Sequence, residues 1–141
     1  MSARALLTLA AAVVACAHPA RDVTIAATDY AYHVPAELPP GPALFRLVNN
    51  GKHPHEVQIF RFNRGMSVQA ANKWLASGIV PDSVGDSWGA VLIASPGVEA
   101  TERVWADLRP GELYALMCQF RDSAGAPMHA KMGMVALLQV K

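Results

Sequence analysis

The chain has 141 residues, of which 52% are hydrophobic and 16% are charged, a balance typical of one globular domain. Its formal net charge is +1, and it contains no basic block interleaved with aromatic residues. Composition and charge therefore exclude nucleic-acid binding as its main function.

The N-terminal segment predicts export. Arg4 precedes a run of apolar residues that is too short to span a bilayer as a permanent helix. The sequence VVAC, ending at Cys16, resembles the lipobox of bacterial lipoproteins, in which the cysteine carries the lipid. We therefore expect a signal peptide over residues 1–15, lipid attachment at Cys16 and a tether over residues 16–22. The resemblance implies a periplasmic or cell-surface protein that is held on a membrane by its lipid alone.

The rest of the chain, residues 23–141, is predicted to be one all-β domain. β-branched and aromatic residues alternate in short runs between Pro/Gly and Asn/Gly turns, which favours a β-sandwich. The expected strands are residues 23–35, 43–48, 55–62, 90–94, 99–108, 111–120 and 134–141. One short helix is expected over residues 66–78, because Ser67 suits its N-cap and Gly78 its end. Trp74 and Trp105 are expected in the core.

Cys118, at the end of an apolar strand, is the first candidate for metal binding. An unpaired thiol in an oxidising compartment is a liability unless it is buried or holds a metal. Two histidines and one cysteine in a plane, with a long bond to methionine, are typical of blue-copper sites. Only His129 follows Cys118, so the second histidine must come from an earlier part of the chain.

Two segments of the sequence resemble the cupredoxin family. NNGKHPHEVQIF is similar to the first-histidine loop of plastocyanin-like cupredoxins, and YALMC with the later HAKMGM is similar to the second half of their site. The resemblance covers about residues 23–141 and implies a Greek-key β-sandwich with one type 1-like copper ion at one end. The copper ligands that it implies are His55, Cys118, His129 and Met134.

Three features depart from the small blue-copper proteins or leave alternatives open. Met132 is an alternative axial ligand to Met134. Ten residues separate Cys118 from His129, whereas the small proteins have only a few; the type 1 site of copper nitrite reductases has a similarly extended segment. Glu56 stands where asparagine often braces the cysteine loop, and we hypothesise that its carboxylate orients the first histidine instead.

The function implied by the resemblance is one-electron transfer outside the cytoplasm, by a carrier and not by an enzyme. A redox protein would dock on an apolar surface around His129, whose solvent-facing edge would pass the electron. The first alternative is copper binding and delivery between a copper donor and an acceptor, since Met128, Met132 and Met134 flank His129. The second is a metal-free cupredoxin-like interaction module.

Enzymatic readings have less support in the sequence. A cysteine–histidine hydrolase would need a cysteine at a helix N-terminus and an oxyanion loop, and the sequence indicates neither. A nitrite reductase needs a second, histidine-rich copper site, and His18, His33 and His53 form no such cluster in sequence. These three histidines are expected at the surface, and Met117 is expected to point away from Cys118 on the same strand.

Overall fold

The computed structural model describes residues 19–141, apart from the side chains of residues 88–90. The predicted signal peptide and the lipid site at Cys16 lie outside the described residues. Within residues 19–141, no helix is both long and apolar enough to cross a membrane.

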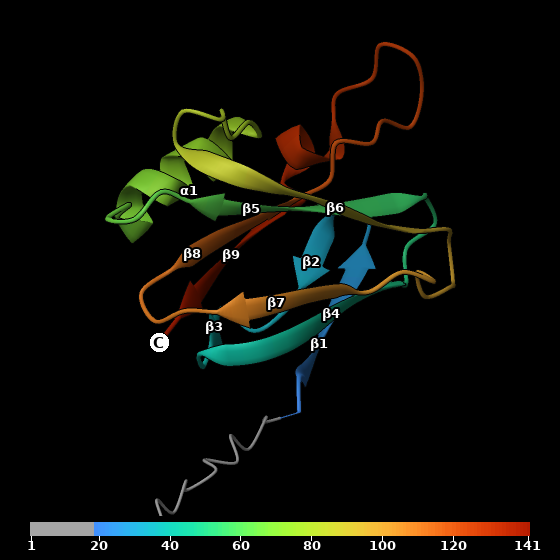
Figure 1. The fold of residues 1–141 in the computed structure, drawn as a ribbon. Helices are drawn as coiled ribbons and strands as arrows, with labels where there is room; N and C mark the ends of the chain where they lie inside the picture. The colour runs from blue at the N-terminus through green and yellow to red at the C-terminus, as the bar shows by residue number, and fades with distance from the viewer. Residues whose placement is uncertain (1–18) are drawn as a thin grey trace, which may run out of the picture.

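Two β-sheets face one another and form a sandwich (Figure 1). The first sheet has the strand order β2-β1-β4-β7. Its strands are β1 (Arg21–Thr28), β2 (Ala31–His33), β4 (Gly41–Asn49) and β7 (Val104–Leu108). In this sheet β1 pairs with β4 in parallel, while β2 and β7 pair antiparallel with their neighbours.

The second sheet has the strand order β3-β9-β8-β5-β6. Its strands are β3 (Glu37–Leu38), β5 (His55–Phe62), β6 (Gly85–Ala94), β8 (Leu113–Met117) and β9 (Val135–Val140). The two central strands, β5 and β8, run antiparallel, with Gln58 opposite Met117 and Arg61 opposite Tyr114. The start of β5 and the end of β8 therefore meet at one end of the sandwich.

The core lies between the sheets and consists of side chains that alternate along each strand. In β4, for example, Ala43, Phe45 and Leu47 are buried, while the residues between them are half-buried. Residues from the opposite sheet, including Ile59 and Leu116, complete the same apolar cluster. Burying each large aliphatic or aromatic side chain contributes about 1.5–3 kcal/mol, so this alternation fixes which face of each strand points inward.

Helix α1 (Val68–Ser77) covers the outer face of the second sheet. The Ser67 hydroxyl accepts a hydrogen bond from the Ala70 amide at 3.1 Å, and Gly78 ends the helix in the left-handed region at φ 67°. Ala71 and Leu75 pack into a second apolar cluster that also contains Met117. The predicted caps Ser67 and Gly78 are confirmed, although the helix spans residues 68–77 and not 66–78. Met117 points away from Cys118, as predicted, because Cys118 belongs to the cluster between the sheets.

Several expectations about strands and aromatic residues differ from the structure. The strand expected over residues 23–35 is two strands, β1 and β2, joined by a turn, and the strand expected over residues 99–108 forms only from residue 104. The short strand expected at residues 90–94 begins already at residue 85. Trp74 and Trp105 are 37% and 62% exposed, not core residues. Trp105 lies on an edge strand whose alternate residues face outward.

Candidate metal centre

Three buried side chains from different elements meet at one end of the sandwich. His55 is the first residue of β5, Cys118 directly follows β8, and His129 begins the short 3-10 helix η1 (His129–Met132). Each of the three is at most 1% exposed. The sequence-predicted histidines and cysteine are therefore brought together, although 62 positions separate Glu56, beside His55, from Cys118.

The distances between the donor atoms fit a single metal ion. His55 Nδ1 lies 3.2 Å from His129 Nδ1, and Cys118 Sγ lies 3.4 Å from His129 Nδ1. One donor atom from each of the three residues falls within 4.8 Å of the others. Atoms bound to one metal at about 2.0–2.3 Å can be no farther apart than about 4.6 Å, so the nitrogen–nitrogen and sulfur–nitrogen pairs meet this limit. A thiolate with two imidazoles suits copper or zinc.

The long segment between Cys118 and His129 is fixed by backbone hydrogen bonds at both of its ends. The Ala130 amide donates to the Cys118 carbonyl at 2.8 Å, and the His129 amide donates to the Phe120 carbonyl at 2.8 Å. The segment therefore leaves and returns at one place, as the orange loop at the upper right of Figure 1 shows. Its length does not loosen the positions of the two donor residues.

The two candidate axial methionines have different environments. Met134 is fully buried in the apolar cluster that contains Cys118, and its carbonyl accepts a hydrogen bond from the Cys118 amide at 3.2 Å. Met132 is 38% exposed. Burial beside the cysteine favours Met134 over Met132 as a donor to a metal in this site.

Glu56 braces the cysteine loop. Its Oε1 accepts a hydrogen bond from the Gln119 amide at 2.9 Å, and its own amide donates to Cys118 Sγ at 3.5 Å. The hypothesis that this carboxylate orients His55 is wrong, because another carboxylate takes that place. A glutamate oxygen therefore fills the bracing role, and it accepts as an asparagine oxygen does.

Asp29 and Asp122 are the site residues that the sequence did not reveal. His55 Nε2 lies 2.7 Å from Asp29 Oδ1, and His129 Nε2 lies 2.9 Å from Asp122 Oδ1. For Asp29, burial acts to raise the pKa but is outweighed by hydrogen bonds from Lys52, His55 and His53, so the pKa falls to about 2. The hydrogen bond from Tyr30 is the main cause that lowers the pKa of Asp122. Both carboxylates are ionised at neutral pH.

These carboxylates determine which nitrogen of each ring carries the proton. An ionised carboxylate only accepts hydrogen bonds, so each histidine must donate from Nε2–H. Burial lowers the pKa of His55, which keeps its ring neutral. In a neutral ring with Nε2–H, Nδ1 carries a lone pair, and the two Nδ1 atoms lie 3.2 Å apart. Two lone pairs that converge in this way beside a thiol favour a bound cation.

The thiol must lose its proton before it can bind a metal. Burial is the main cause that raises the pKa of Cys118 above its ordinary value, so the free residue is a neutral thiol at pH 7. A bound cation would favour the thiolate and release the proton.

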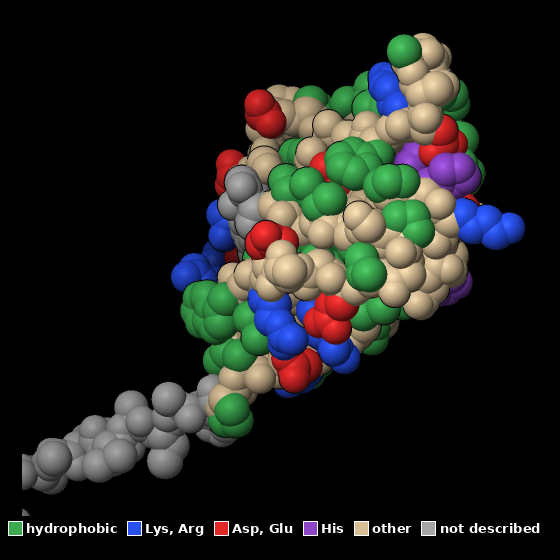
Figure 2. All heavy atoms as spheres, turned by 90° about the vertical axis from the view of Figure 1, so that its right-hand side faces the viewer, with side chains coloured by type: hydrophobic (Ala, Val, Ile, Leu, Met, Phe, Trp, Pro, Cys, Tyr) green, Lys and Arg blue, Asp and Glu red, His purple; other side chains and the backbone are tan. Residues whose placement is uncertain are grey.

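His129 does not present its edge to solvent, contrary to the sequence-based expectation. Its ring is 1% exposed, Asp122 takes its outer nitrogen, and the Tyr30 ring lies 4.7 Å from it, centroid to centroid. The histidine that reaches the surface here is His53, whose side chain is 43% exposed and lies 3.4 Å from Asp29. Figure 2 shows histidine surface bordered by acidic side chains on this face.

Comparisons with known proteins support the fold. No family model matches the sequence, and no curated protein is detectably similar to it. Dithionite-reduced auracyanin from the photosynthetic bacterium Roseiflexus castenholzii matches with a TM-score of 0.53 and 19% identity over 88% of this chain and 99% of that one. Auracyanin B matches with a TM-score of 0.53 and 18% identity over 88% and 91% of the two chains.

A purple cupredoxin from Nitrosopumilus maritimus is a weaker match, with a TM-score of 0.42 and 16% identity over 86% of this chain and 99% of that one. The two-sheet topology and the auracyanin likenesses show that the chain has a cupredoxin-like β-sandwich fold.

Proposed function

We propose that the protein binds one copper ion and carries single electrons. The observation that carries the proposal is the buried triangle of His55, Cys118 and His129, whose Nδ1 and Sγ atoms converge. Met134 is the proposed axial ligand, because it is buried in the same cluster as the cysteine. A copper ion held by such a set cycles between two oxidation states and so takes up or releases one electron.

The chain's own contribution is a rigid, dry enclosure for the donors. All three strong donors are buried, and backbone hydrogen bonds fix both ends of the loop that joins Cys118 to His129. Glu56 holds the Gln119 amide beside the cysteine. A site that is held in this way cannot rearrange far between oxidation states, which favours rapid electron transfer.

The proposed location is outside the cytoplasm, on a membrane. The support is the lipobox-like sequence at Cys16 and the unpaired, buried Cys118, which an exported protein can keep reduced by binding a metal. The partner of a carrier would be another redox protein. Mass spectrometry of the protein from intact cells would show a diacylglyceryl group on residue 16 if this location is right, and an unmodified N-terminus if it is wrong.

Copper delivery is the second candidate function. The exposed Met132, three residues after His129 in η1, favours it, because a thioether on an accessible surface can bind copper(I). The buried triangle opposes rapid exchange. A metal-free interaction module is the third candidate, and it leaves the converging Nδ1 atoms without a role.

Copper titration of the purified protein tests the metal proposals. With one equivalent of copper(II), we expect an intense visible thiolate-to-copper band, and Cys118→Ser should abolish it. No band and no retained copper would overturn both the carrier and the delivery functions.

A redox titration then separates the two functions. Reversible cycling with copper retained against a chelator supports the carrier, whereas irreversible behaviour or rapid loss of copper supports delivery. Met134→Leu should shift the reduction potential if Met134 is the axial ligand, and Met132→Leu serves as its matched control, with no shift expected.

A further inference from the structure

The outer side of the histidine pair is closed by two carboxylates and a tyrosine. Asp29 accepts from His55 Nε2 at 2.7 Å, and Asp122 accepts from His129 Nε2 at 2.9 Å. The Tyr30 hydroxyl donates to Asp122, which links the two halves of this closure. We call Asp29, Tyr30 and Asp122 the carboxylate cap.

The cap is built from two parts of the chain that are distant in sequence. Asp29 and Tyr30 form the turn between β1 and β2, whereas Asp122 belongs to the loop after Cys118. The Tyr30 ring lies 4.7 Å from the His129 ring and 6.1 Å from the His55 ring, centroid to centroid. One aromatic ring therefore packs against both candidate ligands.

Asp29 is held in place independently of the histidine. Its Oδ2 accepts from the Lys52 amide at 2.8 Å, and its Oδ1 accepts from the His53 amide at 3.3 Å. Gly51 leaves room for this arrangement: a Cβ atom there would lie 2.3 Å from Asp29 Oδ1 and 2.9 Å from His55 Nε2. The contact between Asp29 and His55 thus depends on a glycine at position 51.

A carboxylate on the outer nitrogen changes how an imidazole binds a metal. It fixes the tautomer and makes the inner nitrogen a stronger electron donor. Two such carboxylates favour copper(II), the more highly charged ion, over copper(I). The ratio of the two affinities sets the reduction potential, and each tenfold change in that ratio corresponds to 59 mV for a one-electron couple.

We propose that Asp29 and Asp122 are positioning residues that hold both histidines as Nε2–H tautomers and together lower the reduction potential of the site, with Tyr30 orienting Asp122. This inference rests on the proposed copper function. It assigns a role to three residues that touch the ligands but are not themselves ligands.

The tautomers are tested in the metal-free protein. Long-range ¹H–¹⁵N NMR correlations should show His55 and His129 each protonated at Nε2. Asp29→Ala removes the acceptor, and Gly51→Ala displaces it without changing either partner, so in both variants the Nε2–H form of His55 should lose its dominance. Mixed or Nδ1–H tautomers in the unmodified protein would overturn the proposal whether or not copper binds.

The potential is tested with variants of the copper-loaded protein that remove one negative charge. Asp29→Asn and Asp122→Asn each keep one oxygen that can accept from Nε2–H. In Asp29→Asn the amide nitrogen replaces the Oδ2 that accepts from the Lys52 amide. Each variant should weaken copper(II) binding about 10- to 100-fold. If the copper(I) affinity stays constant, each tenfold loss of copper(II) affinity raises the reduction potential by 59 mV.

Asp86→Asn is the matched control, because it removes the same charge from an exposed residue that pairs with Arg61 at the far end of β5. Potentials in Asp29→Asn and Asp122→Asn that equal that of Asp86→Asn would overturn the proposal while leaving the copper function intact. Failure of the unmodified protein to bind copper would overturn the function, and the tautomer measurement would still decide the positioning role.

Discussion

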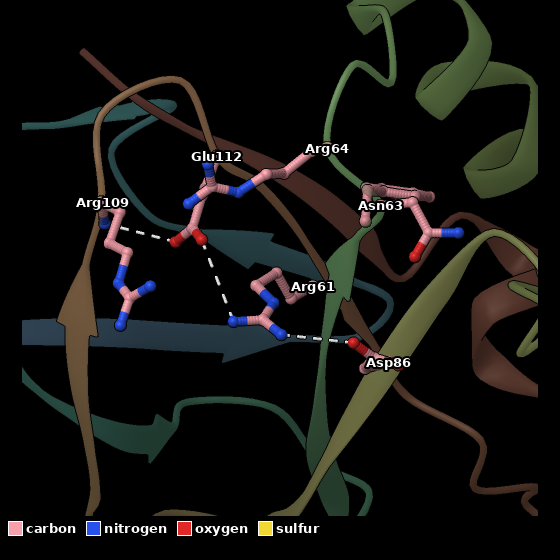
Figure 3. A pocket seen from close by; sticks show the side chains of 7 residues that line it. Arg61, Asn63, Arg64, Asp86, Arg109 and Glu112 are labelled. Atoms are coloured by element: carbon pink, nitrogen blue, oxygen red, sulfur yellow. Dashed lines mark hydrogen bonds and ion pairs between the residues drawn. The ribbon is translucent and has the colours of Figure 1, made fainter.

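The two ends of the central strands β5 and β8 carry polar clusters that differ in burial. At one end, His55 and Cys118 are fully buried beside the carboxylate cap. At the other end, Arg61, Asp86 and Glu112 line a hollow of about 290 Å³, together with Arg64 and Arg109. Figure 3 shows Arg61 between the carboxylates of Asp86 and Glu112.

The difference lies in what covers each end. The turn between β1 and β2 and the loop after Cys118 close the histidine end, where each contact joins a histidine side chain at most 1% exposed to a carboxylate that is 19% or 31% exposed. The Arg61 side chain remains 38% exposed and that of Asp86 66% exposed, so water competes with their ion pair at 3.2 Å. Similar charged contacts should therefore matter much more at the first end than at the second.

Removing a histidine donor should have the largest effect. His129→Ala deletes one corner of the triangle, and we expect copper(II) affinity to fall by more than about 100-fold, beyond the range for outer partners. His33→Ala is the control, since His33 is exposed and its Nε2 lies 3.1 Å from the Thr28 hydroxyl. Competition with a chelator of known affinity measures both. Equal affinities in the two variants would place the copper elsewhere.

Glu56→Ala should destabilise the metal-free protein by about 1–3 kcal/mol, because the Gln119 amide loses its acceptor in a partly buried place. Glu56→Gln keeps an accepting oxygen and should restore most of this stability. Glu99→Ala, which removes an exposed glutamate paired with Arg46 and Arg103, should change little. Urea denaturation measures all three, and a Glu56→Ala protein as stable as the Glu99→Ala protein would refute the bracing role.

At the end of β5 and β8 that carries Arg61, the buried Tyr114 should make the free energy of unfolding fall at alkaline pH. Burial, followed by the hydrogen bond to Glu112, raises the pKa of Tyr114 above its ordinary value of 10. The raised pKa stabilises the fold fully below pH 10, and this contribution is lost as the pH rises further. Above pH 10 the free energy of unfolding should fall with rising pH. In Tyr114→Phe this slope should be smaller by about 1.4 kcal/mol per pH unit. Identical slopes in the two proteins would contradict this.

Arg61→Ala should have the smallest effect. Its ion pairs with Asp86 at 3.2 Å and Glu112 at 3.9 Å are partly exposed, so the expected loss in the free energy of unfolding is at most about 1 kcal/mol. The copper spectrum should not change. A shifted copper band would show that the two ends of β5 and β8 are coupled.

The donors could be predicted from the sequence because each stands beside a recognisable element. His55 begins an alternating strand after an Asn-Asn-Gly turn, and Cys118 ends an apolar one. Helix α1 was predictable from Ser67 and Gly78, whose capping roles depend only on local backbone geometry.

The carboxylate cap could not be predicted, because no local pattern marks it. Asp29 and Tyr30 lie in a turn without glycine or proline, inside what the sequence indicates to be one strand over residues 23–35. Asp122 lies in a loop whose path depends on contacts with the rest of the site. The burial of His129 follows from these same residues, so its predicted exposed edge was wrong for the same reason.

Diffraction from crystals of the copper-loaded protein, recorded on both sides of the copper absorption edge, tests the central claim most directly. We predict one anomalous peak per chain, between His55 Nδ1, His129 Nδ1 and Cys118 Sγ. A peak at the exposed Met132 instead, or no peak among the three donors, would contradict the account.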